Sequence, residues 1–334
     1  MSAVSTASTE SPQLARYRAA ERALWSHYGL APTERFVELD SPPVRLRITE
    51  LGSGPPLVFV HGTAGTGPVW APLLRELSGF RCLLVDRPGW GFSSPLDYSQ
   101  HEYGTVVADV LRGVLDALDL ERADLVGASI GDLWALRTAS AYPQRVERVV
   151  LLGGGPLVSE IEVPPFIRLV ASPLGAVIVR LPLKPGRVRA ILRDAGHAVS
   201  LEEGRIPDVF VDWRASLGRD TDSMKHERNM VQAIVAGRGF RPGLTLSDAE
   251  LAAVEQPTLL AYGTADRVGT VETWKRAVDL IPGGELLVIE GGGHMPWLDD
   301  PERVAERMHR FLDRNGRGGA SQAAPPEPDY GSVT

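Results

Sequence analysis

Short apolar runs alternate with helical patterns along most of the chain. Two runs at 35–39 and 44–48 predict a β-hairpin, and a stripe of large side chains that starts after Ser11-Pro12 and ends near Gly29 predicts an N-terminal packing helix. Further apolar runs predict strands near residues 57–60, 82–86, 124–128, 147–152, 258–262 and 285–289. Because helical patterns separate these runs, we expect an α/β protein with a doubly wound, mostly parallel sheet and right-handed crossovers.

The alternation stops between Pro156 and about Thr245. This span is too long for a loop inside a compact domain, and prolines interrupt its helix-like apolar patterns. We therefore predict a mainly helical cap at 157–245, inserted into an α/β core formed by 11–156 and 246–314. Apolar residues of the cap would line a pocket, form the cap's own core or, where exposed, make a homodimer or membrane contact. They are Ile161, Val163, Phe166, Ile167, Leu169, Val170, Leu174, Val177, Ile178 and Val179.

Composition adds limits to this picture. The 334 residues are 43% hydrophobic and 23% charged, which is ordinary for a soluble globular protein. A formal net charge of −7 argues against a nucleic-acid partner, and the excess of arginine over lysine suggests a GC-rich bacterial genome. No apolar run is long enough to span a membrane, and residues 1–10 lack the features of a secretory signal. We expect a cytoplasmic protein with disordered tails at 1–10 and 315–334 and one buried thiol, Cys82.

The strongest chemical signal is Ser129, which stands at the centre of a Gly-x-Ser-x-Gly pattern between a predicted strand and a predicted helix. A sharp strand-to-helix turn holds its middle residue outward, and small neighbours such as Gly127 and Gly131 let strand and helix approach each other. The serine hydroxyl would then lie beside free N–H groups at a helix N-terminus. This context favours a nucleophile over a serine in an incidental surface turn.

A serine nucleophile needs a base, and that base needs a carboxylate. Among the seven histidines, His294 follows a predicted strand and lies in a loop rich in glycine, where ligands bind in open α/β sheets. His309 lies in a helical pattern instead, and His197 and His226 fall in the cap. Asp266 follows the strand at 258–262; alone it would be interpreted as a turn residue, but it completes the order Ser…Asp…His.

With these residues the chain resembles an α/β-hydrolase-fold serine hydrolase of the esterase or lipase kind, with a cap domain. Two further stretches support the resemblance: His61-Gly62-Thr63 after the strand at 57–60, which is similar to the family's oxyanion loop, and Asp86-Arg87-Pro88-Gly89-Trp90-Gly91-Phe92-Ser93 after the next strand. The resemblance implies a catalytic triad of Ser129, Asp266 and His294 and an oxyanion hole made by the backbone N–H groups of Thr63 and Ile130.

One departure from the family pattern is Asp132, at a position where many relatives carry glycine. An acid in the first turn of a helix is favourable to the helix dipole, so a structural role is favoured; its carboxylate could also exclude anionic substrates or raise the pKa of the base. We include Asp132 among the pocket candidates, together with Trp90, Phe166 and Met295.

A nucleotide-binding alternative is weaker. The glycine-rich loop at 62–67 and the aspartate at 86 imitate a dinucleotide-binding unit, but the glycine spacing is Gly-x-x-Gly-x-Gly and no Gly-Lys-Ser/Thr is present. We therefore expect no cofactor and no metal. His61 is interpreted as a prop for its loop, and Asp86-Arg87 as a buried polar pair or turn stabiliser.

The predicted reaction is hydrolysis of a small ester, lactone or thioester with an apolar portion, through an acyl-enzyme. The same triad could perform C–C bond hydrolysis, acyl transfer, or haloperoxidase or lyase chemistry without a cofactor. Two other classes stay open: a small-molecule receptor with slow turnover that uses the hydrolase pocket, and an interaction module built on the N-terminal helix.

Overall fold

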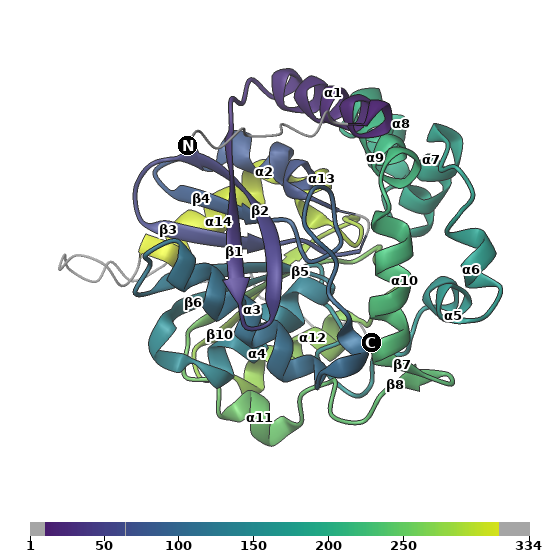
Figure 1. Cartoon of the computed structure of the whole chain (residues 1–334). Helices are drawn as coiled ribbons and strands as arrows, with labels where there is room; N and C mark the ends of the chain where they lie inside the picture. The colour runs from purple at the N-terminus through teal and green to yellow at the C-terminus, as the bar shows by residue number, and fades with distance from the viewer. Residues whose placement is uncertain (1–10, 64, 314–334) are drawn as a thin grey trace, which may run out of the picture.

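The computed structural model describes residues 11–63 and 65–313, and the tails predicted at 1–10 and 315–334 lie outside that part. Eight strands form one sheet in the order β1-β2-β4-β3-β5-β6-β9-β10 (Figure 1). Their bounds are β1 Thr33–Asp40, β2 Pro43–Gly52, β3 Pro56–Val60, β4 Arg81–Val85, β5 Ala123–Ala128, β6 Val146–Leu152, β9 Thr258–Gly263 and β10 Gly284–Ile289. β1 and β2 form the predicted hairpin, and β2 pairs with β4 in antiparallel orientation. The strands from β4 to β10 are parallel, which confirms the predicted sheet.

Helices cover both faces of this sheet. Because successive residues of a strand point to opposite faces, each strand contributes side chains to two separate cores. Val58 and Val60 join an apolar core with α3, α4, α11 and α12, whereas Leu57 and Phe59 join a second core with α2, α13 and α14. Cys82 is buried in the second core. These helices span α2 Ala71–Glu76, α3 Tyr103–Ala117, α4 Ile130–Ala141, α11 Asp248–Ala252, α12 Val271–Leu280, α13 Pro296–Asp299 and α14 Pro301–Asp313, with 3-10 turns η1 Gly67–Trp70, η2 Tyr98–Gln100 and η3 Pro143–Arg145.

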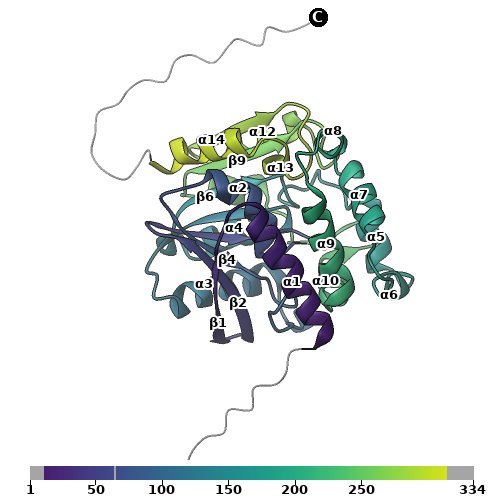
Figure 2. The same ribbon diagram turned by 90° about the horizontal axis from the view of Figure 1, so that it is seen from above.

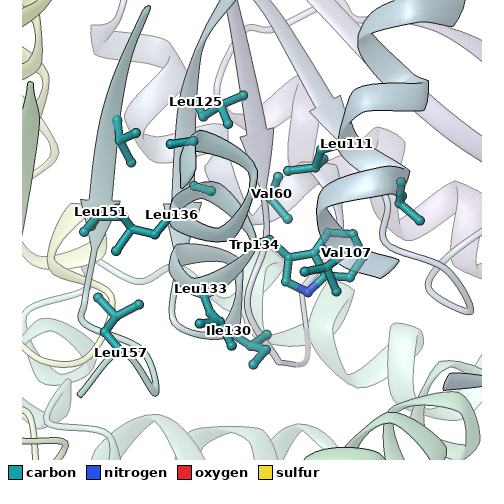
Figure 3. Close-up of a cluster of buried hydrophobic side chains, with 14 of the residues drawn as sticks. Val60, Val107, Leu111, Leu125, Ile130, Leu133, Trp134, Leu136, Leu151 and Leu157 are labelled. Atoms are coloured by element: carbon teal, nitrogen blue, oxygen red, sulfur yellow. The ribbon is translucent and has the colours of Figure 1, made fainter. Parts of the chain in front are cut away.

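Helix α4 is anchored in the first core just below the predicted nucleophile. Figure 3 shows Leu133, Trp134 and Leu136 of α4 among buried side chains that include Leu151 of β6 and Val107 of α3. Trp134 donates its indole N–H to the Tyr103 hydroxyl (2.9 Å). Every residue of β5 is buried as well. The strand and the helix that flank the serine are therefore both fixed by packing, which limits how far the turn between them can move.

Between β6 and α11 the chain forms a separate group of helices, the inserted segment (residues 157–245). Its ends meet where Leu246 N–H donates to Leu157 O (2.7 Å). It contains α5 Pro165–Ala171, α6 Gly175–Ile178, α7 Pro185–Asp194, α8 Ala198–Glu202, α9 Asp208–Asp220 and α10 Ser223–Ile234, and a short hairpin of β7 Val235–Ala236 and β8 Gly239–Phe240. Of its predicted apolar residues, Ile161, Val163 and Val170 are buried, while Leu169, Leu174 and Val177 are exposed.

The N-terminal helix α1, Pro12–His27, packs along α9 of the inserted segment (Figure 2). Tyr17, Leu24 and Trp25 of its predicted stripe are buried in the second core. The helix thus joins the body of the protein to the inserted segment. Among the described residues, no helix combines the length and the apolar character needed to cross a membrane.

Candidate active site

Ser129 occupies the strained turn between β5 and α4. Its backbone has φ 53° and ψ −119°. In the described part of the chain only one other non-glycine residue has a positive φ, a conformation that is strained for residues with a side chain. The neighbouring glycines are required by contact: a Cβ on Gly131 would lie 2.1 Å from Val60 O, and one on Gly127 would lie 2.5 Å from Gly131 O. The Ser129 hydroxyl does not cap α4. The turn therefore presents the hydroxyl at the helix N-terminus, free for chemistry.

His294 and Asp266 form a hydrogen-bonded pair at the carboxyl ends of β10 and β9. His294 Nδ1 and Asp266 Oδ2 are 2.7 Å apart, and the other carboxylate oxygen accepts the N–H of Val268 (3.0 Å). Burial opposes the charged imidazolium, but the charge and hydrogen bond of Asp266 outweigh it, so the pKa of His294 lies above its ordinary value. The structure thus brings together the predicted base and the predicted acid, with Nε2 of the histidine left for the nucleophile.

A glycine-rich loop after β6 connects the serine turn to the histidine loop. A Cβ on Gly153 would lie 1.9 Å from His294 O, and a Cβ on Gly155 would lie 2.0 Å from Ser129 O. The serine turn and the histidine loop therefore both touch this one short segment, in which only glycine fits at positions 153 and 155. Within the described residues, no hydrogen bond joins Ser129 Oγ to His294 Nε2, a contact that in enzymes without ligand is often long and tightens on binding.

The predicted oxyanion loop approaches Ser129 from β3. A Cβ on Gly62 would lie 3.0 Å from Ser129 Cβ, which places the Gly62–Thr63 backbone against the serine. His61 is fully buried, and burial holds its pKa well below the ordinary value, so its ring is neutral. Its Nδ1 donates to Gly62 O (2.8 Å) and its Nε2 accepts the N–H of Arg87 (3.0 Å). His61 thus braces the loop.

Asp86 and Arg87 are both fully buried but have different partners. Asp86 accepts the N–H of Gly67 (2.8 Å) and lies 3.4 Å from Arg47, whereas Arg87 donates to His61 O and Gly62 O (2.9 and 3.1 Å). They hold the two ends of the oxyanion loop separately. Of the two sequence-based interpretations, a buried polar pair and a turn stabiliser, the pair is wrong, because the two side chains bind different partners.

A buried ionic cluster supports the same loop from below and includes α1. Arg47 of β2 donates to both carboxylate oxygens of Glu21 (2.9 Å each). The Tyr17 hydroxyl bonds Glu21 and Thr66 (2.7 Å each), so the helix is tied to the loop at Thr66. Glu21 and Arg47 are almost entirely buried.

Asp132 lies inside the protein beneath the serine turn. It has no exposed surface, one of its carboxyl oxygens accepts the N–H of Leu152 (3.1 Å), and the other has no partner among the described residues. Burial raises the pKa of Asp132 well above its ordinary value, outweighing the N–H groups of Leu152, Ser129 and Gly155. The carboxyl group joins α4 to the end of β6, away from any surface a substrate could reach.

The other pocket candidates differ in accessibility. Trp90 is 1% exposed and donates its indole N–H to Glu227 (2.9 Å), and Met295 is also buried, whereas Phe166 on α5 is half-buried. Two surface hollows, of about 690 and 180 Å³, lie at β7–β8 and beside α8, and neither is lined by a triad residue. Among the described residues, no group of three or more His, Cys, Asp or Glu side chains could hold a metal ion.

The inserted segment supplies buried polar residues that the sequence analysis missed. Arg214 of α9 is 8% exposed, and it has no hydrogen bond or ion pair within the described part of the chain. Burial lowers the pKa of Arg214 to about 10, and its positive charge in turn lowers the pKa of His294. The available signal was an arginine that directly follows Trp213 and lies on the same helical pattern as Phe210, Val211 and Leu217.

His197 contacts the histidine loop, and Glu227 contacts the predicted oxyanion loop. His197 Nε2 accepts the N–H of Met295 (3.2 Å) while its Nδ1 bonds Asp299 (3.0 Å), and Glu227 accepts the hydroxyl of Thr63 (2.7 Å). In the sequence, nothing distinguished these residues from polar or surface side chains of a cap, because their partners are distant along the chain.

Comparisons with known proteins agree with this architecture. The model of the alpha/beta hydrolase family matches residues 57–307. A 2-hydroxy-6-oxononadienedioate/2-hydroxy-6-oxononatrienedioate hydrolase of Cupriavidus pinatubonensis is 29% identical over 297 residues, with 84% of this chain and 96% of the relative covered. A pimeloyl-[acyl-carrier protein] methyl ester esterase of Xanthomonas campestris pv. campestris is 29% identical over 286 residues, covering 80% and 98%.

The fold also matches solved structures. A carboxylesterase of Bacillus subtilis superposes with a TM-score of 0.71 and 21% identity, covering 90% of this chain and 98% of that one. The family model spans most of the chain, and the fold confirms the α/β-hydrolase architecture that the sequence predicted. The chain belongs to the alpha/beta hydrolase family.

Proposed function

We propose that this chain is a serine hydrolase with Ser129 as nucleophile, His294 as general base and Asp266 as the carboxylate that orients the histidine. The observation that carries the proposal is the strained Ser129 turn, placed across a glycine loop from the Asp266–His294 pair. Asp266 fixes the imidazole with its proton on Nδ1, so Nε2 is the nitrogen that accepts the serine proton.

Acyl transfer then follows from the geometry. Ser129 Oγ attacks the substrate carbonyl while His294 takes the proton, and the backbone N–H groups of Thr63 and Ile130 stabilise the negative oxygen of the tetrahedral intermediate. His294 returns the proton to the leaving group, and a water molecule activated by the same histidine releases the acyl group from the serine. We also propose that the inserted segment is a cap over this site.

The first candidate substrate class is a carboxylic ester, lactone or thioester with an apolar portion. It is supported by the esterases among the relatives, one of which is named as an esterase of pimeloyl-[acyl-carrier protein] methyl ester. A fluorophosphonate probe should label Ser129 of the native chain, and Ser129→Ala should lose both labelling and turnover of p-nitrophenyl esters while it keeps the native fold. Undiminished ester hydrolysis by Ser129→Ala would overturn the proposal.

Hydrolysis of a carbon–carbon bond in a substrate that bears a carboxylate is the second candidate. A specific observation favours it: among the described residues the buried Arg214 guanidinium has no carboxylate partner, and its positive charge lowers the pKa of His294. A desolvated guanidinium without a partner is costly, and a substrate carboxylate would supply the missing hydrogen bonds. The relative from Cupriavidus pinatubonensis is named as a hydrolase of 2-hydroxy-6-oxononadienedioate, a compound with two carboxylates. Products should be analysed after incubation with a 2-hydroxy-6-oxo-dienoate and with neutral esters. Cleavage of the former would support C–C bond hydrolysis, and cleavage of the esters alone would support the first candidate.

A further inference from the structure

The peptide unit that presents the oxyanion donor is held by its opposite end. Its carbonyl, Gly62 O, accepts the Nδ1 proton of His61 (2.8 Å) and an NH2 proton of Arg87 (3.1 Å). Because a trans peptide is planar, fixing the C=O of Gly62 fixes the direction of the N–H of Thr63, which points the other way. The aim of that N–H therefore depends on what holds Arg87 and Thr63 in place.

Both are held by one residue of the inserted segment, Glu227 of α10. One carboxylate oxygen accepts the Thr63 hydroxyl (2.7 Å), and the other accepts the Trp90 indole N–H (2.9 Å) and lies 3.3 Å from Arg87. The Glu227 side chain is 1% exposed, so these contacts are made away from solvent. Charge-assisted hydrogen bonds between buried groups have well-defined geometry, and a carboxylate left without them would be costly.

We propose that Glu227 is a positioning residue that fixes the Gly62–Thr63 peptide. The geometry of the oxyanion hole then depends on the position of the inserted segment. The inference rests on the proposed serine hydrolase function. Glu227 touches no reacting atom; it acts through the Thr63 side chain and through Arg87. A shift of about 1 Å in an oxyanion donor is enough to reduce turnover by about 100-fold, so a loss of this anchor should appear in kcat.

Ser223 offers a matched control one helical turn before Glu227. It is also on α10 and equally buried, and its hydroxyl bonds the N–H of Gly91 (3.0 Å) and the hydroxyl of Thr221 (2.7 Å), neither of which belongs to the oxyanion loop. Ser223→Ala therefore removes a hydrogen bond between α10 and the core without altering the support of Thr63. A merely structural role of α10 would make Ser223→Ala and Glu227 variants behave alike.

The experiment measures kcat, KM and thermal stability of the full chain on a p-nitrophenyl ester. Glu227→Ala should lower kcat by about 10- to 100-fold with KM nearly unchanged, and Glu227→Gln, whose amide oxygen can still accept the Thr63 hydroxyl, should lose less. Affinity for a trifluoromethyl ketone, whose adduct places an oxyanion in the hole, should fall by the same factor. Ser223→Ala should keep kcat within about twofold.

A double-mutant cycle tests the route of the effect. Thr63→Val removes the hydroxyl but keeps the backbone N–H, and Glu227→Ala removes its acceptor, so the Glu227→Ala/Thr63→Val double variant should lose less than the product of the two single losses. Independent, multiplicative losses, or Glu227→Gln and Glu227→Ala with the kcat of Ser223→Ala, would overturn the inference. If Glu227→Ala does not fold, Glu227→Gln decides, because its kcat and its affinity for the trifluoromethyl ketone should still fall together and by more than those of Ser223→Ala. Ser129→Ala tests the proposed function separately, because its loss of labelling and turnover is expected whatever the role of Glu227.

Discussion

The α/β core and the inserted segment contribute different kinds of residues to the same place. The core supplies Ser129, Asp266 and His294, each at the carboxyl end of a strand or just beyond it. The inserted segment supplies Arg214 and Glu227, both buried and both charged. Under the proposed function, the core would determine which reaction is possible, whereas the inserted segment would adjust the charge and the position of the groups that perform it.

The segment also holds the histidine loop. The N–H of His294 donates to Ala195 O (2.8 Å), and the buried His197–Asp299 pair accepts the N–H groups of Met295 and Gly293 (3.2 and 2.8 Å). Together with Glu227, these contacts attach the segment to the oxyanion loop and to the histidine loop. Because these hydrogen bonds are buried, they hold the inserted segment in a fixed position against both loops.

The largest expected effect comes from the core. Asp266→Asn should lower kcat/KM by about 10⁴-fold, because the amide no longer stabilises the imidazolium or fixes the required tautomer. Since Asp266 is what raises the pKa of His294, the residual activity should also reach its plateau at lower pH. A pH–rate profile on a neutral ester checks both results, and near-native activity would place the acid elsewhere. Asp212→Asn, an exposed substitution, is the control.

The core could be predicted from the sequence because backbone geometry dictates its residue types. Only glycine fits at Gly127 and Gly131, so the serine turn is visible as a pattern of letters, and the strand ends locate Asp266 and His294. The sequence did not reveal Arg214, Glu227 or the burial of Asp132. Their environments are produced by contacts between residues far apart in the chain, such as Glu227 with Thr63, and no local period records such contacts.

The second effect tests the cluster that joins α1 to the core. Arg47→Met leaves the buried carboxylates of Glu21 and Asp86 without their cation, which should lower the free energy of unfolding by about 3–5 kcal/mol. Denaturant unfolding followed by far-UV circular dichroism measures the loss. Arg45→Met, on the same strand but with a half-exposed side chain, should change stability by less than about 1 kcal/mol. Equal losses in both variants would contradict a special role for the buried cluster.

The third effect tests the inserted segment's charge. Arg214→Met should lower kcat/KM by about 10- to 100-fold for a substrate with a carboxylate, and change it little for a neutral ester of the same size, because one charge-assisted hydrogen bond is lost. Removal of the cation also removes an influence that lowers the pKa of His294, so the acidic limb of the pH–rate profile should move to higher pH. A uniform loss across both substrates, with no shift of the limb, would show that Arg214 serves packing alone.

The smallest effect returns to the core, at Asp132. Its pKa in the folded chain is raised by burial, so between the ordinary pKa of an aspartate, about 3.9, and the raised value the unfolded chain releases a proton that the folded chain keeps. The stability of the native chain should therefore fall as pH rises through that window, by up to about 1.4 kcal/mol per pH unit. Asp132→Asn carries no titrating proton, and its amide oxygen can still accept the N–H of Leu152.

Urea unfolding of both proteins at several pH values isolates this term. The free energy of unfolding of Asp132→Asn minus that of the native chain should increase with pH from about 4 upward, whatever its value at the lowest pH. The slope is the informative quantity, because the intercept also contains the changed contacts with the N–H groups of Ser129 and Gly155. Parallel curves would mean that the carboxyl group is ionised in the folded chain. The core would then hold an uncompensated charge beneath Ser129, as the inserted segment does at Arg214. Buried unpaired charge would then no longer distinguish the inserted segment from the core.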